Sequence, residues 1–154
     1  MLHNGLIVLG WREWLALPAL GIAAIKTKID SGARTSSLHV ESLDSYERDG
    51  KTWLRFDVLT RRRRRELVLH CDAPASDRRA VSDSGGHVSE RWFIRTSFEL
   101  AGCRWDAEMN LTSRRDMLFP LLLGRNALSG RFVVDPAAAY CCGRPPVRHR
   151  RNSR

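Results

Sequence analysis

The sequence predicts an all-β domain built as a closed barrel or a sandwich. Short segments that alternate apolar and polar residues recur along the 154 residues, and turn residues separate them at close spacing. Asp49-Gly50 is the strongest of these turn signals, because this pair favours a two-residue hairpin. No long amphipathic helix is visible in the sequence. Many short strands joined by tight turns are typical of barrels and sandwiches.

The clearest predicted strand spans residues 25–29. Ile25, Thr27 and Ile29 alternate there with polar residues, so one face is suited to burial. Ala101-Gly102 predicts a turn between two later strands. The remaining predicted elements are strands at 51–59, 91–100 and 104–111, an apolar strand that ends at Gly124, and one short helix at 126–129.

The composition indicates one globular domain. A chain of 154 residues that is 43% hydrophobic can bury a real core, since chains of about 150 residues bury roughly two-thirds of their unfolded surface. The early "LIVLG" segment is too short for a secretory signal, and no stretch approaches the roughly 20 apolar residues of a membrane helix. The four cysteines are irregularly spaced, which suits neither a disulfide framework nor a regular metal site. We therefore expect a soluble cytoplasmic protein with no membrane partner.

The net charge of +9 is concentrated in two short segments. Arg61 to Arg65 supply five arginines, and residues 144–154 supply five more; the 26 basic residues without these ten leave 16 against 17 acidic ones. We interpret the first run as a solvated hairpin and the second as a basic, disordered tail, which leaves residues 1–143 as the single domain. Nucleic acid is therefore not the expected partner, although both segments could attract an acidic ligand.

The triplet Asp30-Ser31-Gly32 directly follows the strand at 25–29. Burial makes a carboxylate costly to ionise, so an acid at the end of a buried strand is either a catalyst or a turn residue. The triplet alone is a weak signal, since it arises by chance in about one chain in fifteen of this length. Its flanks make it informative: an apolar strand precedes it, Ala33 follows it, and a second apolar strand ends at Gly124.

These segments resemble the retropepsin-like aspartic peptidases. "DSGA" and "LLGRN" match the family's catalytic motif and the strand that packs beside it, and "GRFVVDP" follows in the expected order. The resemblance covers residues 8–140. It is more narrowly to the bacterial branch often labelled ATP-dependent zinc protease, which includes glutamate-tail-trimming members linked to ATP-grasp glutamate ligases. It implies a closed all-β barrel with one short helix after the Leu-Leu-Gly-Arg strand.

The resemblance also assigns roles to residues. Asp30 would be the catalytic acid. The residues that would support its loop are Ser31, Gly32 and Ala33. Those that would pack against the loop are Leu122, Leu123, Gly124 and Arg125, with a structural part for Arg125 favoured over a catalytic one. Those that would lie near the substrate are Arg34, Thr35, Ser36 and His39.

Aspartic catalysis needs two carboxylates that share a proton. The second "DSGG" copy, at Asp83, has no apolar strand before it and no Leu-Leu-Gly partner, so we interpret Asp83 as a turn residue. We therefore expect a symmetric homodimer in which each subunit contributes one Asp30. One of the hairpins between Arg61 and Glu90 is expected to act as a lid.

No cofactor or metal is expected, despite the family label. The sequence holds neither a phosphate-binding loop nor an "H-E-x-x-H" motif, and the His and Cys residues lack zinc spacing. The resemblance implies an aspartic endopeptidase acting on acidic or glutamate-extended protein tails. Its implied partners are such a substrate and an ATP-grasp glutamate ligase or the ligase's ribosomal protein product.

Two other functions stay open. One is a non-catalytic module of the same fold that binds acidic protein tails or RNA, since a fold alone does not establish activity. The other is a metal-dependent peptidase, which a chelator would inactivate. An Asp30→Asn substitution separates the first from the enzyme, because it abolishes cleavage but leaves binding intact.

Overall fold

The fold is given by a computed structural model that describes residues 1–62, 64–83, 85–113 and 118–144. Regular structure in these residues is β-strand apart from one short 3₁₀ turn and one short α-helix, as predicted. In chain order the elements are β1 (Leu2–His3), β2 (Leu6–Leu9), β3 (Arg12–Leu17), the 3₁₀ turn (Pro18–Leu20), β4 (Ile22–Ile29), β5 (Ser36–His39), β6 (Ser42–Arg48), β7 (Lys51–Arg62), β8 (Arg65–Ser82), β9 (Val88–Leu100), β10 (Cys103–Thr112), β11 (Leu121–Leu123), α1 (Arg125–Leu128) and β12 (Phe132–Val134).

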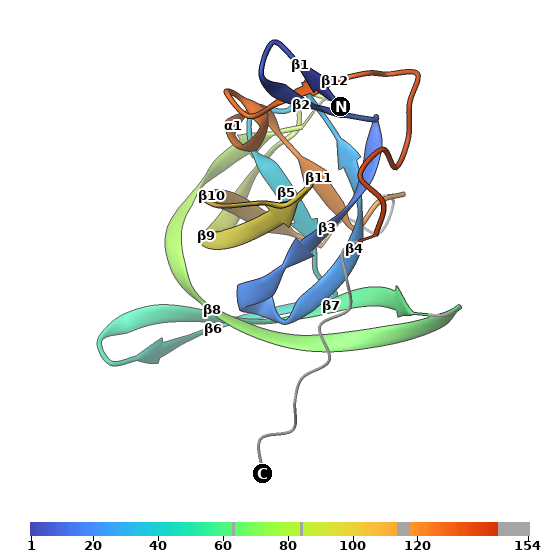
Figure 1. Cartoon of the computed structure of the whole chain (residues 1–154). Helices are drawn as coiled ribbons and strands as arrows, with labels where there is room; N and C mark the ends of the chain where they lie inside the picture. The colour runs from blue at the N-terminus through green and yellow to red at the C-terminus, as the bar shows by residue number, and fades with distance from the viewer. Residues whose placement is uncertain (63, 84, 114–117, 145–154) are drawn as a thin grey trace.

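Six strands close into a ring. They are hydrogen-bonded in the order β10-β5-β11-β4-β3-β9, and β9 pairs in turn with β10. β8, β7 and β6 continue the sheet outward from β9, so this part leaves the ring (Figure 1). β1, β2 and β12 form a separate three-stranded sheet at the end of the molecule where α1 lies (Figure 1). The predicted fold, all-β and closed with one helix after the Leu-Leu-Gly strand, is confirmed.

Alternating side chains of the strands fill the interior. On β4, Ile25, Thr27 and Ile29 are buried and the lysines between them are exposed, which confirms the predicted alternation. Fully burying one large apolar side chain contributes about 1.5–3 kcal/mol. Other large side chains that are fully buried include Phe56, Phe93, Phe98, Leu9, Leu15, Leu17, Ile22, Leu38, Leu54, Ile94 and Met109.

Two hairpin turns lie where the sequence predicted them. Asp49 and Gly50, with φ of 51° and 75°, join β6 to β7. Ala101 and Gly102, with φ of 55° and 76°, join β9 to β10. Positive φ at both central residues is the geometry that matches the right-handed twist of the flanking strands.

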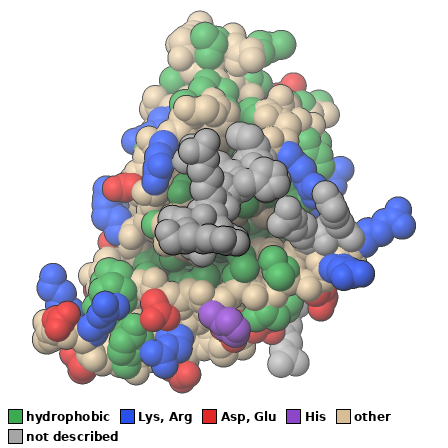
Figure 2. All heavy atoms as spheres, turned by 60° about the horizontal axis from the view of Figure 1, so that its bottom comes forward, with side chains coloured by type: hydrophobic (Ala, Val, Ile, Leu, Met, Phe, Trp, Pro, Cys, Tyr) green, Lys and Arg blue, Asp and Glu red, His purple; other side chains and the backbone are tan. Residues whose placement is uncertain are grey.

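The arginine run forms the tip of the β7–β8 hairpin. Arg62 pairs with Arg65 across the two strands, and Arg61 pairs with Glu66. Arg61, like Arg65, is exposed, as expected for a solvated hairpin. The hairpin extends beyond the ring (Figure 1). Basic and acidic side chains are interspersed on the face at the base of that view (Figure 2).

A buried carboxylate ties the C-terminal part of the described chain to β3. Glu13 is fully buried. Its Oε2 accepts hydrogen bonds from the N–H groups of Gly10 at 2.7 Å and Cys141 at 3.0 Å, and its Oε1 accepts one from the N–H of Cys142 at 3.1 Å. These three donors compensate for the burial of the carboxylate. This arrangement was not predicted, because charged residues are rarely fully buried.

Most of the predicted basic tail lies outside the described residues, because the last of these is Arg144. Within the described residues, no helix has the length and apolar character needed to cross a membrane.

Candidate active site

Asp30 lies where β4 ends and the chain turns toward β5. Its N–H donates to the carbonyl oxygen of Leu123 on β11 at 2.9 Å, and its own carbonyl accepts a hydrogen bond from the N–H of Ala33 at 3.2 Å. One carboxylate oxygen, Oδ1, accepts a hydrogen bond from the N–H of Gly32 at 3.1 Å. The loop therefore fixes both the backbone of Asp30 and one of its carboxylate oxygens, while the residue stays only half-buried.

β11 brings the second predicted segment against this loop. It pairs in parallel with β4, with Leu122 and Leu123 opposite Lys28 and Ile29, and it pairs antiparallel with β5. Leu123 is fully buried and Leu122 half-buried. The two segments that the sequence singled out are therefore adjacent in the structure.

Gly124 follows β11 and touches the chain just after the loop. A Cβ at this position would lie 2.5 Å from the carbonyl carbon of Thr35 and 3.0 Å from the backbone nitrogen of Ser36. No side chain fits at such distances, so the position requires glycine. The N–H of Gly124 donates to Oγ of Ser36 at 3.0 Å, and both residues are buried.

Arg125 supports the loop from the first turn of α1. Its Nη1 donates to the carbonyl oxygens of Ser31 and Gly32, both at 3.0 Å, and its N–H donates to the carbonyl of Ala33 at 2.8 Å. Nη1 carries two N–H donors, so this one nitrogen can bind both carbonyls. These contacts are all to the loop backbone, which matches a structural part for Arg125.

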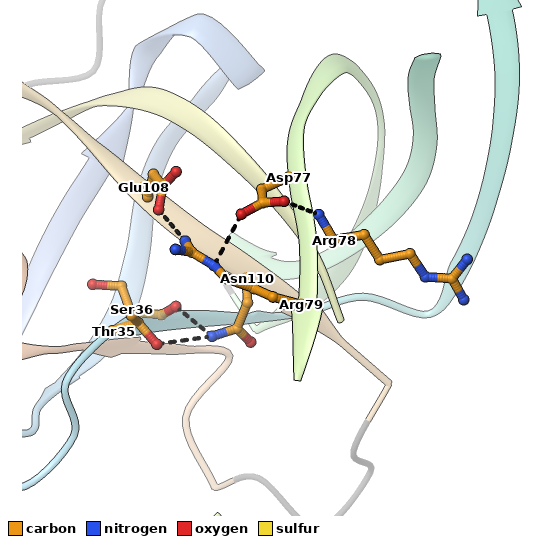
Figure 3. Close-up of polar contacts among 7 residues, drawn as sticks. All are labelled: Thr35, Ser36, Asp77, Arg78, Arg79, Glu108 and Asn110. Carbon is orange, nitrogen blue, oxygen red and sulfur yellow. Dashed lines mark hydrogen bonds and ion pairs between the residues drawn. The ribbon is translucent and has the colours of Figure 1, made fainter. Parts of the chain in front are cut away.

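A buried amide links the chain after the loop to β10. Asn110 is fully buried, and its Nδ2 donates to the carbonyl of Ser36 at 2.9 Å and to Oγ1 of Thr35 at 3.3 Å (Figure 3). Its Oδ1 accepts a hydrogen bond from Nη1 of Arg91 at 3.0 Å. Sequence analysis singled out neither Asn110 nor Arg91. The available signal was an asparagine inside a predicted strand, where this residue is depleted and needs partners if buried.

The second Asp-Ser-Gly-Gly segment forms the turn between β8 and β9. Oδ1 of Asp83 accepts hydrogen bonds from the N–H groups of Gly85 and His87, both at 2.9 Å. This is the turn geometry expected for an Asp whose side chain bonds the backbone two residues on, and Ser84 lies outside the described residues. β8 curves from the base of the view to the end of the molecule that carries α1 (Figure 1).

The four residues predicted near the substrate lie in two places. Arg34 is exposed beside the Asp30 loop, and Thr35 and Ser36 follow it into β5. His39 lies at the other end of β5, where its Nε2 is 2.9 Å from Oε1 of Glu41. There it borders a cavity of about 550 Å³, and Asp30 is not among the described residues that line it. Other residues around this cavity are Trp14, Lys26, Arg61, Glu66 and Pro120.

The cysteines and histidines do not assemble into a metal site within the described residues. No group of three or more His, Cys, Asp or Glu side chains is placed there to hold an ion. The four cysteines are free thiols. Burial raises the pKa of Cys71 to about 11, and burial together with nearby Glu13 raises the pKa of Cys142 to about 11. The reactive thiolate form is therefore disfavoured at both.

Residues 8–145 match the family model described as the retropepsin-like aspartic endopeptidase RimB. The chain belongs to the RimB-like family. The match spans the Asp30 loop, β11 and α1, and it confirms the resemblance drawn from the sequence motifs.

Two curated relatives of the chain are longer proteins. The chain is 39% identical over 136 residues to a probable alpha-L-glutamate ligase of Shewanella halifaxensis, and 40% identical over 136 residues to one of Desulfotalea psychrophila. Both matches cover 88% of this chain but only 30% and 29% of the relatives. The chain thus spans about three-tenths of the length of these curated proteins.

A solved structure has the same fold. The crystal structure of Lpg0085, a protein of unknown function from Legionella pneumophila, superposes with a TM-score of 0.73 at 26% sequence identity. The superposition covers 91% of this chain and 99% of the Legionella chain.

Proposed function

We propose that this RimB-like chain is an aspartic endopeptidase that works as a homodimer and hydrolyses peptide bonds in glutamate-rich protein tails. The observation that carries the proposal is the Asp30 loop itself. Its carboxylate is half-buried, one of its oxygens is held by the N–H of Gly32, and its backbone is held by Leu123 and, through the loop, by Arg125. Backbone N–H groups also hold the carboxylate of the turn residue Asp83. The Asp30 loop differs because β11 and Arg125 hold its backbone as well, and such preorganisation is what a catalytic carboxylate needs.

The chemistry requires a second carboxylate. In this mechanism an ionised Asp30 takes a proton from a water molecule while the water oxygen attacks the peptide carbonyl carbon. The protonated Asp30 of the partner subunit donates to the carbonyl oxygen. When the tetrahedral intermediate collapses, the C–N bond breaks and the amide nitrogen leaves as an amine with the proton that the first Asp30 took from the water. The partner's Asp30 recovers its proton from a hydroxyl group of the intermediate. The other Asp-Ser-Gly segment of the chain forms a hairpin turn, so a second copy of the Asp30 loop is the natural source.

Features of the three-stranded sheet support the proposal that the chain forms a dimer. β1 and β12 are its edge strands, and edge strands carry backbone groups that can pair with another chain. Met1 and Leu2 expose 98% and 67% of their surface there, and adjacent apolar side chains of this kind can be buried when two chains associate. The sheet lies at the end of the molecule that holds α1 (Figure 1), next to the Asp30 loop. A two-fold axis through this end would bring two copies of Asp30 together.

Two exposed cationic side chains near Asp30 support the proposal that the substrate is acidic. Lys28 precedes Asp30 by two residues and Arg34 follows it by four, and both side chains are exposed. Within the described residues, neither side chain forms a hydrogen bond or ion pair, so both can pair with substrate carboxylates. The relatives named as glutamate ligases point to glutamate as the residue concerned. The β8–β9 hairpin is the proposed lid, because Arg91 connects it to Asn110 beside the loop.

The test uses a protein that ends in an oligoglutamate tail. Wild type and Asp30→Asn are incubated with it, with and without a chelator, and the products are read by mass spectrometry. We expect shortening of the tail by wild type, no shortening by Asp30→Asn, and no effect of the chelator. Equal cleavage by both proteins would refute the catalytic part of Asp30, and loss of activity with the chelator would indicate a metal-dependent peptidase.

Two further measurements separate the alternatives. Analytical ultracentrifugation under assay conditions is expected to give the mass of two chains, and an active species with the mass of one chain would refute the shared site. Tail binding without cleavage by wild type, retained in Asp30→Asn, would instead support a non-catalytic binding module.

A further inference from the structure

The β8–β9 hairpin leaves the ring at Phe93. β9 pairs with β10 from Leu100 to Phe93, and its pairs beyond that point are with β8, up to Ser82 opposite Val88. The residues beyond Phe93, 78–82 and 88–92, form what we call the arm. Within the described residues, the two strands of the arm pair only with each other, so the arm can move as a unit if its side-chain contacts with the ring break.

Two arginines connect the arm to β10. Arg79 on β8 and Arg91 on β9 lie opposite each other in the arm. Arg79 pairs with Glu108, and it also lies 3.4 Å from the carboxylate of Asp77 (Figure 3). Arg91 binds Asn110 through its Nη1. Glu108 and Asn110 are two residues apart on β10 and therefore share one face of the strand.

The two connections differ in burial. The Arg79 and Glu108 side chains are 43% and 32% exposed, and ion pairs in contact with water contribute little. Asn110 is 0% exposed and Arg91 is half-buried, so breaking their hydrogen bond leaves a buried amide oxygen without this partner. The Arg91–Asn110 contact is therefore the stronger of the two.

From Asn110, hydrogen bonds and short stretches of covalent chain lead to the Asp30 loop. Its Nδ2 binds the Ser36 carbonyl at 2.9 Å, and Oγ of Ser36 accepts a hydrogen bond from the N–H of Gly124 at 3.0 Å. The next residue, Arg125, holds the carbonyls of Ser31 and Gly32. A displacement of Asn110 would thus reach the residues that orient the Asp30 carboxylate.

We propose that Asn110 is a positioning residue that couples the arm to the Asp30 loop. Its side-chain carbonyl oxygen binds the arm, and its NH₂ group binds the chain that follows the loop. A movement of the arm therefore displaces the chain next to the loop through one planar amide. An asparagine suits this part because it carries an acceptor and two donors on one rigid group. The catalytic consequence rests on the proposed function, whereas the mechanical coupling does not.

The test compares Arg91→Gln with Arg95→Gln. Arg91→Gln removes the guanidinium that holds Asn110 and leaves every residue of the Asp30 loop unchanged. Arg95 lies on the same strand, is exposed, and donates to the Asp106 carbonyl at 3.4 Å, so it serves as the matched control. Hydrogen exchange is measured at the amides of Gly32 and Gly124, because the first reports on the Asp30 carboxylate and the second on Ser36.

We expect Arg91→Gln to speed exchange at both glycine amides at least threefold, while Arg95→Gln leaves them unchanged. In the tail-cleavage assay, kcat of Arg91→Gln should fall about tenfold with KM changed less than twofold, since small misplacements of a catalytic group have large effects on rate. Faster exchange confined to arm amides, with Gly32 and Gly124 unchanged, would overturn the coupling.

A second variant tests the amide itself. Asn110→Asp keeps an acceptor for Arg91 but removes the donor to Ser36, so it should speed exchange at Gly124 and leave the arm amides protected. Hydrogen exchange at the Gly124 amide as slow in this variant as in wild type would also overturn the proposal. If wild type cleaves no tail, the proposed function fails, but the exchange measurements still decide the coupling.

Discussion

The buried carboxylate of Glu13 allows a quantitative prediction for Glu13→Gln. The substitution keeps the shape of the side chain and replaces one oxygen by an NH₂ group. With the remaining oxygen in the Oε2 position, the N–H groups of Gly10 and Cys141 keep their acceptor, and the N–H of Cys142 faces another donor. Loss of one hydrogen bond to a charged group at a fully buried site costs about 1.5–3 kcal/mol.

Urea unfolding followed by tryptophan fluorescence measures this cost. With a denaturant slope of about 2 kcal/mol/M, a loss of about 2 kcal/mol lowers the unfolding midpoint by about 1 M. Glu47→Gln is the control, because Glu47 is exposed and accepts one surface hydrogen bond from Thr52; its effect should stay within about 0.5 kcal/mol. Hydrogen exchange adds a local readout, with faster exchange expected at Cys142 than at Gly10. A midpoint equal to that of wild type, with Cys142 still protected, would refute the reasoning.

Two further predictions concern Gly124 and the Asp57–His70 pair. Gly124→Ala forces a Cβ against the Thr35 carbonyl and should lower the free energy of unfolding by about 1–3 kcal/mol; an unchanged urea midpoint would contradict the close approach. The hydrogen bond from His70 lowers the pKa of Asp57 below its ordinary value of 3.8, so this pair stabilises the fold above about pH 4 and the contribution is lost as the pH falls through the lowered pKa. His70→Ala should raise that pKa toward 3.8 in a carboxyl-carbon NMR titration, and an unshifted titration would rule out His70 as the cause.

A strand with one buried and one exposed face is readily predicted from the sequence. Residues 25–29 alternate for this reason and fall within β4. β8 spans Arg65–Ser82 but is exposed along most of its length, so burial imposes no period on it. β3 was not predicted as a strand because Glu13 lies at an inward-facing position. A polar residue at such a position breaks the expected alternation of buried apolar and exposed polar residues. The predicted helix was displaced by one residue, since α1 begins at Arg125.

The Asp30 loop and the Gly124 segment were predicted as neighbours because both have local motifs that resemble one family. Asn110 has no such motif. Its partners Thr35 and Ser36 are 75 and 74 residues away in the sequence, and only the parallel register of β10 with β5 brings them together. Contacts of this kind depend on strand pairing that one sequence does not reveal.

The loop that carries Asp30 is held almost entirely through its main chain. Arg125 and Asn126 bind the carbonyls of four consecutive residues, from Ser31 to Arg34. Side chains at Ser31 and Arg34 can therefore vary during evolution without dislodging the acid. In such a scaffold, the surface beside Asp30 can change in character while the carboxylate keeps its position.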